Sequence, residues 1–451
     1  MLLVRTTLLL ACALSLLAQT DPAQPDSAQD NSGSEYSGPA ILSRGENPVP
    51  QNAAPVAFRP YIGFSGVYDT GLLAVGVNSK GEIPTTDLYG EELNLGAYTY
   101  RNWKRTTLSL DYRGNFRHYS SSYWDGTDQL LSLALSHRSS KRTTFTLREQ
   151  AGTYSRYYAL GAPLGELDPS YLQTPQNDIF DNRVIFLSTS GDLTYRASGR
   201  LSFNFGGDGN LVRRRSSALY GLTGAIARAD MEYRVTRHST IGVDYRYMRY
   251  DYTRGYGNSN IHSVGLNYST QFSPHLQFSA RVGGARVETL SLAEITLDPA
   301  VAALLGESVA IQSAHRLNYI PDIQARLTDT FRQSRFSLAY YNTVDPGNGV
   351  YLTSHSNQGT ASYSYTGVRY WNFGADASYG RMNALLQTIG AYTTYGAGVG
   401  ITRELGKGFH AVGRMDARHY DIAVTSAFSH NEYRATLGLT FSPGDLPLAL
   451  W

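Results

Sequence analysis

Cysteine is almost absent from this sequence. Its 451 residues contain one cysteine, Cys12, which lies in the first apolar segment. Without that segment the chain would hold no thiol, so disulfides are not expected in its fold. Charge is also scarce: charged residues make up 17% of the chain, below the usual quarter, and the net charge is +2. A charge this close to balance gives no indication of a nucleic-acid partner.

Long hydrophobic runs are missing after the first segment. The mean hydropathy is −0.30, which argues against a bundle of membrane helices. Residues 1–18, MLLVRTTLLLACALSLLA, place one positive charge before an apolar run and predict a signal peptide cleaved after Ala18. The Leu-Leu-Ala-Cys stretch ending at Cys12 leaves a lipoprotein site as an alternative. Residues 19–57 are rich in Pro, Ser, Asp, Gln and Asn and predict a disordered periplasmic tail.

Glycine, tyrosine and strict alternation are abundant. The chain has 44 Gly and 34 Tyr. In TTLSLDYRGNFRHYSS (106–121) apolar side chains take the even positions from Leu108 to Phe116, and charged ones take odd positions. The same period of two recurs from Phe58 to Phe441, which predicts a long series of strands. Further runs are LLSLALSH (130–137), LSFNF (201–205), TIGVDYRY (240–247), SVGLNYST (263–270) and LQFSARVG (276–283).

Short polar turns join these runs in pairs. Connections such as NWKR (102–105), RASGR (196–200) and GKG (406–408) alternate with longer ones rich in Gly, Asn, Asp and Tyr. A transmembrane β-barrel has this asymmetry, with short periplasmic turns and long extracellular loops, whereas a soluble sandwich has no reason for it. We therefore predict an all-β fold, a single transmembrane antiparallel up-and-down β-barrel of about 18 strands (16–18). It would span residues 58–441, followed by a C-terminal tail at 442–451.

Two connections are longer than the others, at about 158–182 and 288–314, and each contains the triplet Leu-Asp-Pro. In the second, DPAVAALLGES (298–308) predicts a short helix with Asp298 as its N-cap. The sequence leaves open whether either insertion narrows the pore or lies outside it.

The charges indicate which face of the wall looks inward. The apolar faces hold many small residues, such as Ala375 and Ala377, which would leave voids in a soluble core but cost little against lipid. The opposite faces carry charges of both signs, which a wet lumen accommodates as cross-strand ion pairs. We therefore expect the apolar faces to contact lipid. The predicted pore-lining residues are Asp111, Arg113, Arg117, Arg148, Arg228, Asp230, Glu232, Arg234, Asp244, Arg246, Arg281, Asp322, Arg326, Asp376, Arg414, Asp416 and Arg418.

Tyrosines gather near the expected strand ends and in the long connections. Examples are YDTGLLAV (68–75), SRYYAL (155–160) and RYMRYDYTRGYG (246–257). They predict aromatic girdles at the two membrane interfaces. The alternative is that tyrosine simply favours strands.

Over about 58–441 the chain resembles a bacterial outer-membrane β-barrel of the porin type. The resemblance rests on the signal peptide, the lack of cysteine elsewhere, the rhythm of hairpins and the last strand, YRATLGLTF (433–441). That strand is similar to the terminal strand recognised by the barrel-assembly machinery, although residues 442–451 continue past it. The strand count also resembles sugar-specific porins and exopolysaccharide-export barrels. The resemblance implies an outer-membrane location among lipid and lipopolysaccharide, and a periplasmic partner if the chain serves export.

No group of residues predicts catalysis. The best candidate is His118 with Ser120 or Ser121, as in an outer-membrane lipase, but the sequence offers no third partner. No histidine pair has metal-ligand spacing, and no Gly-rich phosphate loop leads from a strand into a helix. We therefore predict no enzyme activity, no cofactor and no metal. Residues 19–57 are too few and too polar for a plug domain, which argues against a TonB-dependent transporter.

Three functions follow from this reading. The first is a monomeric channel for hydrophilic, anionic or saccharide solutes, with polysaccharide export as one use; arginine would give bidentate contacts and tyrosine stacking. The second is a structural or adhesive barrel with a closed lumen and binding loops. The third, an enzyme barrel, is disfavoured by the lack of a site. Opposed charges also allow a lumen that neutralises itself and selects little.

Overall fold

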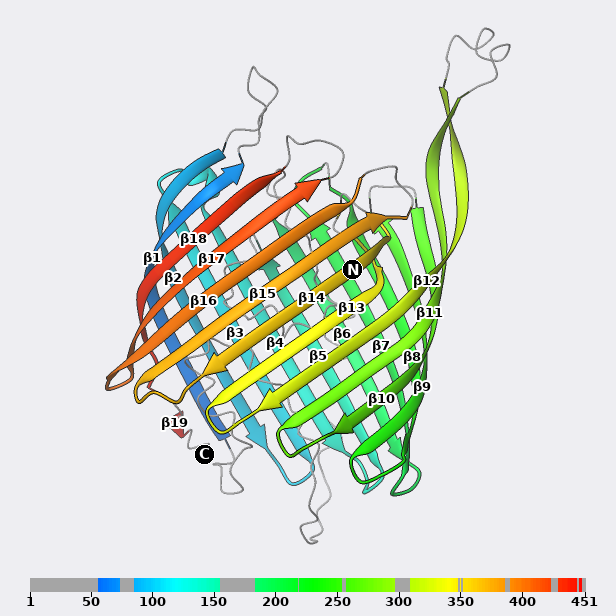
Figure 1. Ribbon diagram of the computed structural model, residues 1–451, viewed down its shortest axis with the longest axis horizontal. Coiled ribbons are helices and arrows are strands. Elements are labelled where there is room, and N and C mark those ends of the chain that lie inside the picture. Colours follow the sequence, from blue (N-terminus) through cyan, green and yellow to red (C-terminus); the bar gives the residue numbers. More distant parts are fainter. Residues whose placement is uncertain are drawn as a thin grey trace, which may run out of the picture. The chain divides into compact units, whose positions relative to one another are not determined.

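In the part of the chain that the structure describes, eighteen antiparallel strands pair in chain order and close on themselves (Figure 1). The computed structural model describes residues 56–73, 85–154, 183–217, 219–253, 257–296, 309–347, 349, 352–385, 390–422, 429–443 and 446–447. β1 (Val56–Leu73) pairs with β2 (Thr85–Asn102) on one side and with β18 (His430–Phe441) on the other. The first and last strands therefore leave no open edge between them, and the predicted antiparallel barrel is confirmed.

The intervening strands each run the height of the wall. They are β3 (Thr106–Tyr119), β4 (Gly126–Arg138), β5 (Thr143–Tyr154), β6 (Val184–Arg196), β7 (Leu201–Arg214), β8 (Gly221–Arg234), β9 (Ser239–Thr253), β10 (Gly257–Gln271), β11 (Leu276–Thr296), β12 (Val309–Thr330), β13 (Ser334–Asp345), β14 (Ser354–Tyr365), β15 (Trp371–Ala384), β16 (Tyr392–Gly406) and β17 (Phe409–Ile422). A 3₁₀ helix (Ser122–Trp124) follows β3, and a two-residue strand, β19 (Leu446–Pro447), pairs with β1.

The two ends of the barrel differ in their connections. We call the end where β1 begins and β18 finishes the turn end. Its connections are short: the shortest consists of residues 407–408 and the longest of residues 366–370. At the opposite end, the loop end, most are longer, as expected. One exception is the connection at 254–256, because β9 continues to Thr253 and takes up residues that the sequence had suggested for a loop.

The tightest turn joins β16 to β17 through Lys407 and Gly408. Their φ angles are 52° and 82°, so both lie in the left-handed region that a two-residue hairpin turn requires. Gly408 takes this conformation without strain because it has no Cβ.

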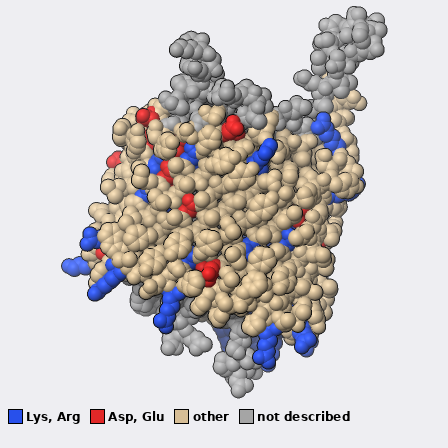
Figure 2. All heavy atoms as spheres, viewed as in Figure 1, with Lys and Arg blue, Asp and Glu red and all other residues tan. Residues whose placement is uncertain are grey.

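The outer surface is apolar. Large apolar side chains alternate along each strand and point outward, with Leu437 74% exposed and Leu266 65% exposed. Figure 2 shows a broad wall with few charges and Lys and Arg side chains at its lower edge, which is the turn end in Figure 1. Glu149 is an exception on the outward face of β5, where it accepts a hydrogen bond from Thr189 at 2.8 Å. An apolar outer surface is typical of a β-barrel whose wall contacts lipid.

Exposed aromatic side chains mark the turn end. Each of the eight turns there has one in it or close beside it: Trp103, Phe145, Tyr195, Tyr233, Phe272, Phe331, Tyr370 and Phe409. Exposed tyrosines near the loop end include Tyr89, Tyr319, Tyr395 and Tyr433. The structure corrects one part of the girdle prediction. Tyr250 and Tyr252 belong to the inward face of β9 and are buried, because they share the parity of Asp244.

One hairpin extends beyond the others. β11 and β12 remain paired from Leu276–Asp329 to Thr296–Val309 and project past their neighbours in Figure 1. Much of the insertion predicted at 288–314 is therefore paired strand, while the predicted helix at 298–308 lies outside the described residues. β12 pairs with β13 only up to Ile323. Pro321 follows the end of that ladder, where a residue without an N–H is tolerated.

The segment boundaries differ slightly from the expected ones. β1 begins at Val56, two residues before the predicted start at 58, and β19 lies within the predicted tail at 442–451. The predicted signal peptide, the rest of the tail before Val56 and the insertion at 158–182 lie outside the described residues. Within the described ranges no helix is long and apolar enough to cross a membrane.

Candidate functional site

The interior wall carries the charged side chains. Strand register places every predicted pore-lining residue on the inward face, because each shares the parity of a buried inward neighbour. Arg113, Asp244 and Arg281 are almost fully buried there, whereas Arg148 is exposed on the same face. The inward orientation inferred from alternation is therefore observed for all of them. Their role in lining an open pore stays a prediction.

The seam between the first and last strands is held by one arginine. Arg434 on β18 lies opposite Asp69 on β1 and reaches past it to pair with Glu92 on β2. Asp69 also accepts a hydrogen bond from the Tyr119 hydroxyl on β3. Arg434 and both carboxylates are buried. This group joins four strands across the closure, and Asp69, Glu92 and Arg434 were not predicted from the sequence.

A second arginine gathers two carboxylates between β9 and β12. Arg281 donates to Asp244 at 2.7 Å and to the Ser263 hydroxyl at 2.8 Å, and it also pairs with Asp322. Ser263 in turn donates to Asp322 at 2.7 Å. Arg246 lies 3.3 Å from Asp244. Because Asp244 and Asp322 both form ion pairs with arginine, this part of the wall presents little net charge.

The same arrangement recurs around the barrel. Arg117 and Asp128 pair at 2.9 Å with both side chains fully buried. Arg228 bridges Asp192 at 2.8 Å and Asp208 at 2.5 Å. Arg414 bridges Asp376 at 2.8 Å and Asp416 at 2.6 Å, and Arg113 pairs with Asp111 at 2.6 Å. We call Arg117, Arg281 and Arg434 the clamped arginines, because carboxylates hold them against the wall.

Inward arginines on three neighbouring strands lack such partners. Arg138 on β4, Arg148 on β5 and Arg196 on β6 are exposed and form no ion pair within the described residues. Their strands are neighbours, so the three form one basic face from mid-wall to the turn end. We call them the open arginines. Arg148 was predicted from the sequence, whereas Arg138 and Arg196 were not, although their parity along the strands identifies them as inward.

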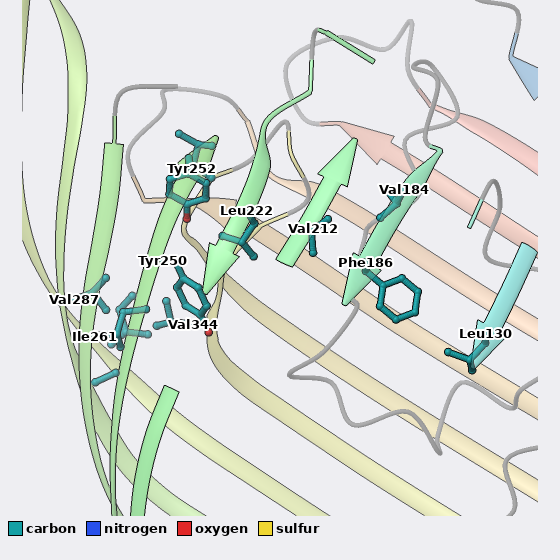
Figure 3. Close-up of a cluster of buried hydrophobic side chains, with 13 residues drawn as sticks. Leu130, Val184, Phe186, Val212, Leu222, Tyr250, Tyr252, Ile261, Val287 and Val344 are labelled. Atoms are coloured by element: carbon teal, nitrogen blue, oxygen red, sulfur yellow. The ribbon is translucent and has the colours of Figure 1, made fainter. Parts of the chain in front are cut away.

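An apolar layer lines part of the interior toward the loop end. Figure 3 shows Val184, Phe186, Val212 and Leu222 on adjoining strands, with Tyr250, Ile261 and Val287 farther along the wall. Ile261 and Val287 are completely buried. Val344 belongs to this cluster although it has the outward register of β13. The part of β13 at the loop end is therefore bent into the barrel, beside the point where β12 stops pairing with β13.

The connection from β13 to β14 is fixed to strands elsewhere in the wall. The Tyr252 hydroxyl on β9 donates to the Pro346 carbonyl at 3.2 Å and lies 2.6 Å from the Thr353 hydroxyl. The Tyr220 amide donates to the Gly349 carbonyl at 3.0 Å. Gly349 has a φ of 92°, and a Cβ there would lie 2.4 Å from Nε of Arg214. Only glycine fits this approach, which brings the loop against the interior wall.

The catalytic candidate is an exposed ion pair. His118 faces outward near the loop end, and its Nδ1 lies 2.9 Å from Asp125. Asp125 also accepts a hydrogen bond from the Tyr119 amide, which lowers the pKa of its carboxyl. In the described ranges no contact joins His118 to Ser120 or Ser121, and no three His, Cys, Asp or Glu side chains are placed to hold a metal.

Several features decide the class of protein. An even number of antiparallel strands closes on itself, the outer wall is apolar between aromatic belts, and the interior is charged. The chain is a closed antiparallel β-barrel with the wall of a transmembrane barrel. No family model matches it, and no curated protein matches its sequence.

Solved structures with barrel folds are similar to it at low identity. OccK5 (OpdH) of Pseudomonas aeruginosa is 13% identical with a TM-score of 0.42, covering 86% of this chain and 98% of that one. OccK2 (OpdF) of the same organism, in complex with glucuronate, is 12% identical with a TM-score of 0.43 and the same coverage. OccAB3 of Acinetobacter baumannii is 10% identical with a TM-score of 0.41, covering 86% and 99%. The strand pairing and the apolar outer surface define the architecture of this barrel.

Proposed function

We propose that the barrel is an outer-membrane channel for small hydrophilic solutes and that it prefers anions. The observation that carries this proposal is the basic face formed by the open arginines Arg138, Arg148 and Arg196. Carboxylates neutralise the clamped arginines, so these cannot attract a solute strongly. An exposed guanidinium offers paired N–H donors to a carboxylate or phosphate, which fits an anionic solute.

Saccharides are a weaker part of the proposal. A sugar ring would need accessible aromatic faces in the lumen, and the inward Tyr250 and Tyr252 are buried against their own wall. No described residue favours the export of polysaccharide, so this use stays a prediction from the sequence alone.

Single-channel recording in a planar bilayer tests the channel. We expect stepwise currents, and a reversal potential in a KCl gradient that shows chloride to be more permeant than potassium. The variant R138Q/R148Q/R196Q should conduct with its anion preference lost. Arg381→Gln on the outward face is the control and should behave as wild type. A folded barrel that passes no current would overturn the proposal.

The projecting β11–β12 hairpin favours a second candidate, a barrel that binds a surface partner. Its strands continue beyond the last pairing of β12 with β13. Replacing residues 289–316 with a tight turn should leave the current unchanged in a channel. In a binding barrel, the replacement would abolish adherence of whole cells, and no current would be present in either form.

A further inference from the structure

The turns at the turn end carry positive charges and no negative ones. Seven of the eight contain Lys or Arg, and none contains Asp or Glu. The basic residues are Lys104, Arg105, Lys141, Arg142, Arg200, Arg237, Arg332, Arg369 and Lys407. Positive charge at this end, next to the aromatic belt, lies at the height of lipid headgroups.

One corner of this end has a more specific geometry. Arg403 on β16 lies directly opposite Trp371 on β15, and its guanidinium is 5.0 Å from the indole centre. In the adjoining turn the Arg369 guanidinium is 4.7 Å from the ring centre of Tyr370. The Tyr370 carbonyl accepts a hydrogen bond from the Glu404 amide at 2.8 Å, which ties the turn to β16. We call Arg369, Tyr370, Trp371 and Arg403 the basic–aromatic corner.

The two arginines of the corner keep their N–H groups available. Each guanidinium lies over the face of an aromatic ring. This contact leaves the N–H donors at the edge of the guanidinium free. Within the described residues neither Arg369 nor Arg403 makes an ion pair. Tyr370 has a φ of 66°, an unfavourable left-handed conformation for a residue with a large side chain. Such backbone strain is concentrated at binding sites.

Apolar side chains border the corner on its outer side. Val368 is 45% exposed, Leu405 is 53% exposed, and Phe409, the first residue of β17, is 49% exposed. Glu404, the nearest acidic residue along β16, shares the inward face with His410. A free anion would gain nothing from these neighbours, whereas a lipid would place its acyl chains on them.

We propose that the basic–aromatic corner binds the phosphate diester of an anionic glycerophospholipid from the leaflet at the turn end. Arg369 and Arg403 donate to the phosphate oxygens, Trp371 and Tyr370 hold the two guanidinium groups in place, and Val368 and Leu405 contact the acyl chains. The site is on the outer wall and does not depend on whether the lumen conducts.

Native mass spectrometry of the full chain from neutral detergent tests this site. Phosphatidylglycerol and phosphatidylcholine with the same acyl chains are titrated separately, and inorganic phosphate is then added as a competitor. We expect tighter binding of phosphatidylglycerol, weakened by on the order of fivefold in Arg369→Gln or Arg403→Gln and about thirtyfold in the double variant. Arg381→Gln, an outward arginine at the other end of β15, is the matched control and should bind as wild type.

Trp371→Leu separates the geometry from the charge. It keeps both arginines but removes one ring, and the proposal requires a loss of several-fold. Folding of each variant is checked by heat-modifiable migration on gels, and the single variants decide if the double variant does not fold. The proposal is wrong if the arginine variants retain the lipid preference, or if Arg381→Gln loses as much. Full displacement of the lipid by inorganic phosphate would assign the corner to free anions instead.

Discussion

The clamped and the open arginines are the same residue type on the same face of one wall, yet they face different surroundings. Arg434 is buried between Asp69 and Glu92, and Arg117 is buried with Asp128. Arg148 shares the inward face with them and is exposed without an ion pair. The difference lies in the neighbouring strands. Carboxylates lie within reach of the side chains of the first group, whereas Arg148 lies opposite Ala134 and Ser190.

This contrast separates stability from selectivity. A buried ion pair contributes little compared with an apolar pair, but removing one partner leaves an uncompensated charge that is costly. An exposed arginine in water costs little to keep or to remove. The clamped arginines should therefore govern how firmly the barrel holds together, and the open arginines should govern what passes through it.

The largest effect is expected at the seam. Arg434→Gln leaves Asp69 and Glu92 buried without their cation, and should lower the free energy of unfolding by about 3–5 kcal/mol. Urea unfolding in lipid vesicles measures the change. Arg148→Gln serves as the matched control and should change stability by less than about 0.5 kcal/mol. Equal effects of the two substitutions would remove the distinction between the two groups.

The second effect is on selectivity. Changing all three open arginines to glutamate should turn the preference from anions to cations, shifting the permeability ratio by on the order of tenfold. The reversal potential in a KCl gradient measures this ratio. The same experiment on Arg381→Glu controls for charge on the outer wall, and a similar shift there would contradict a role for the interior face.

A smaller effect is expected where the β13–β14 loop meets β9. Tyr252→Phe removes the hydroxyl that donates to Pro346 and contacts Thr353, at a cost of about 1 kcal/mol. We expect noisier single-channel currents, because the loop is held less firmly. Tyr250→Phe is the control; that hydroxyl donates to the Met248 sulfur at 3.7 Å. Unchanged noise in Tyr252→Phe would mean that the loop does not border the conducting path.

The smallest effect is that of salt. Raising KCl from about 0.1 M to about 1 M shortens the screening length from about 10 Å to about 3 Å. Anion preference from the open arginines should fall, while the stability supplied by buried pairs should hardly change. Permeability ratios and unfolding midpoints over the same salt range test both halves. Anion preference that survives high salt would point to direct contacts with the solute.

Most of the wall was predictable from alternation. The series of apolar and polar positions fixed the strands, and the charges fixed the inward face of Asp111, Arg113 and Arg117. Extending the same parity past Tyr247 would have placed Tyr250 and Tyr252 inside. Predicting a girdle there failed because the run was treated as a loop when it was still a strand.

Other features depend on contacts between residues that lie far apart in the sequence. Local sequence patterns could not predict them. Arg434 and Glu92 are 342 residues apart, and no local pattern pairs them. Val344 lies in the interior cluster despite the outward register of β13, which a period of two does not reveal. The basic–aromatic corner needs the register of β15 and β16, which sets Arg403 opposite Trp371.

The group at the seam, formed by Arg434, Asp69, Glu92 and Tyr119, has a consequence for the order of events in folding. Its residues come from the first three strands and the last one, so they meet only once the entire wall has formed and closed. An interaction formed that late adds nothing to the rate of reaching the closed state. It acts instead on the reverse step, because opening the barrel must break it first. Arg434 therefore governs the lifetime of the finished barrel, and the speed of its assembly is left to the hairpins.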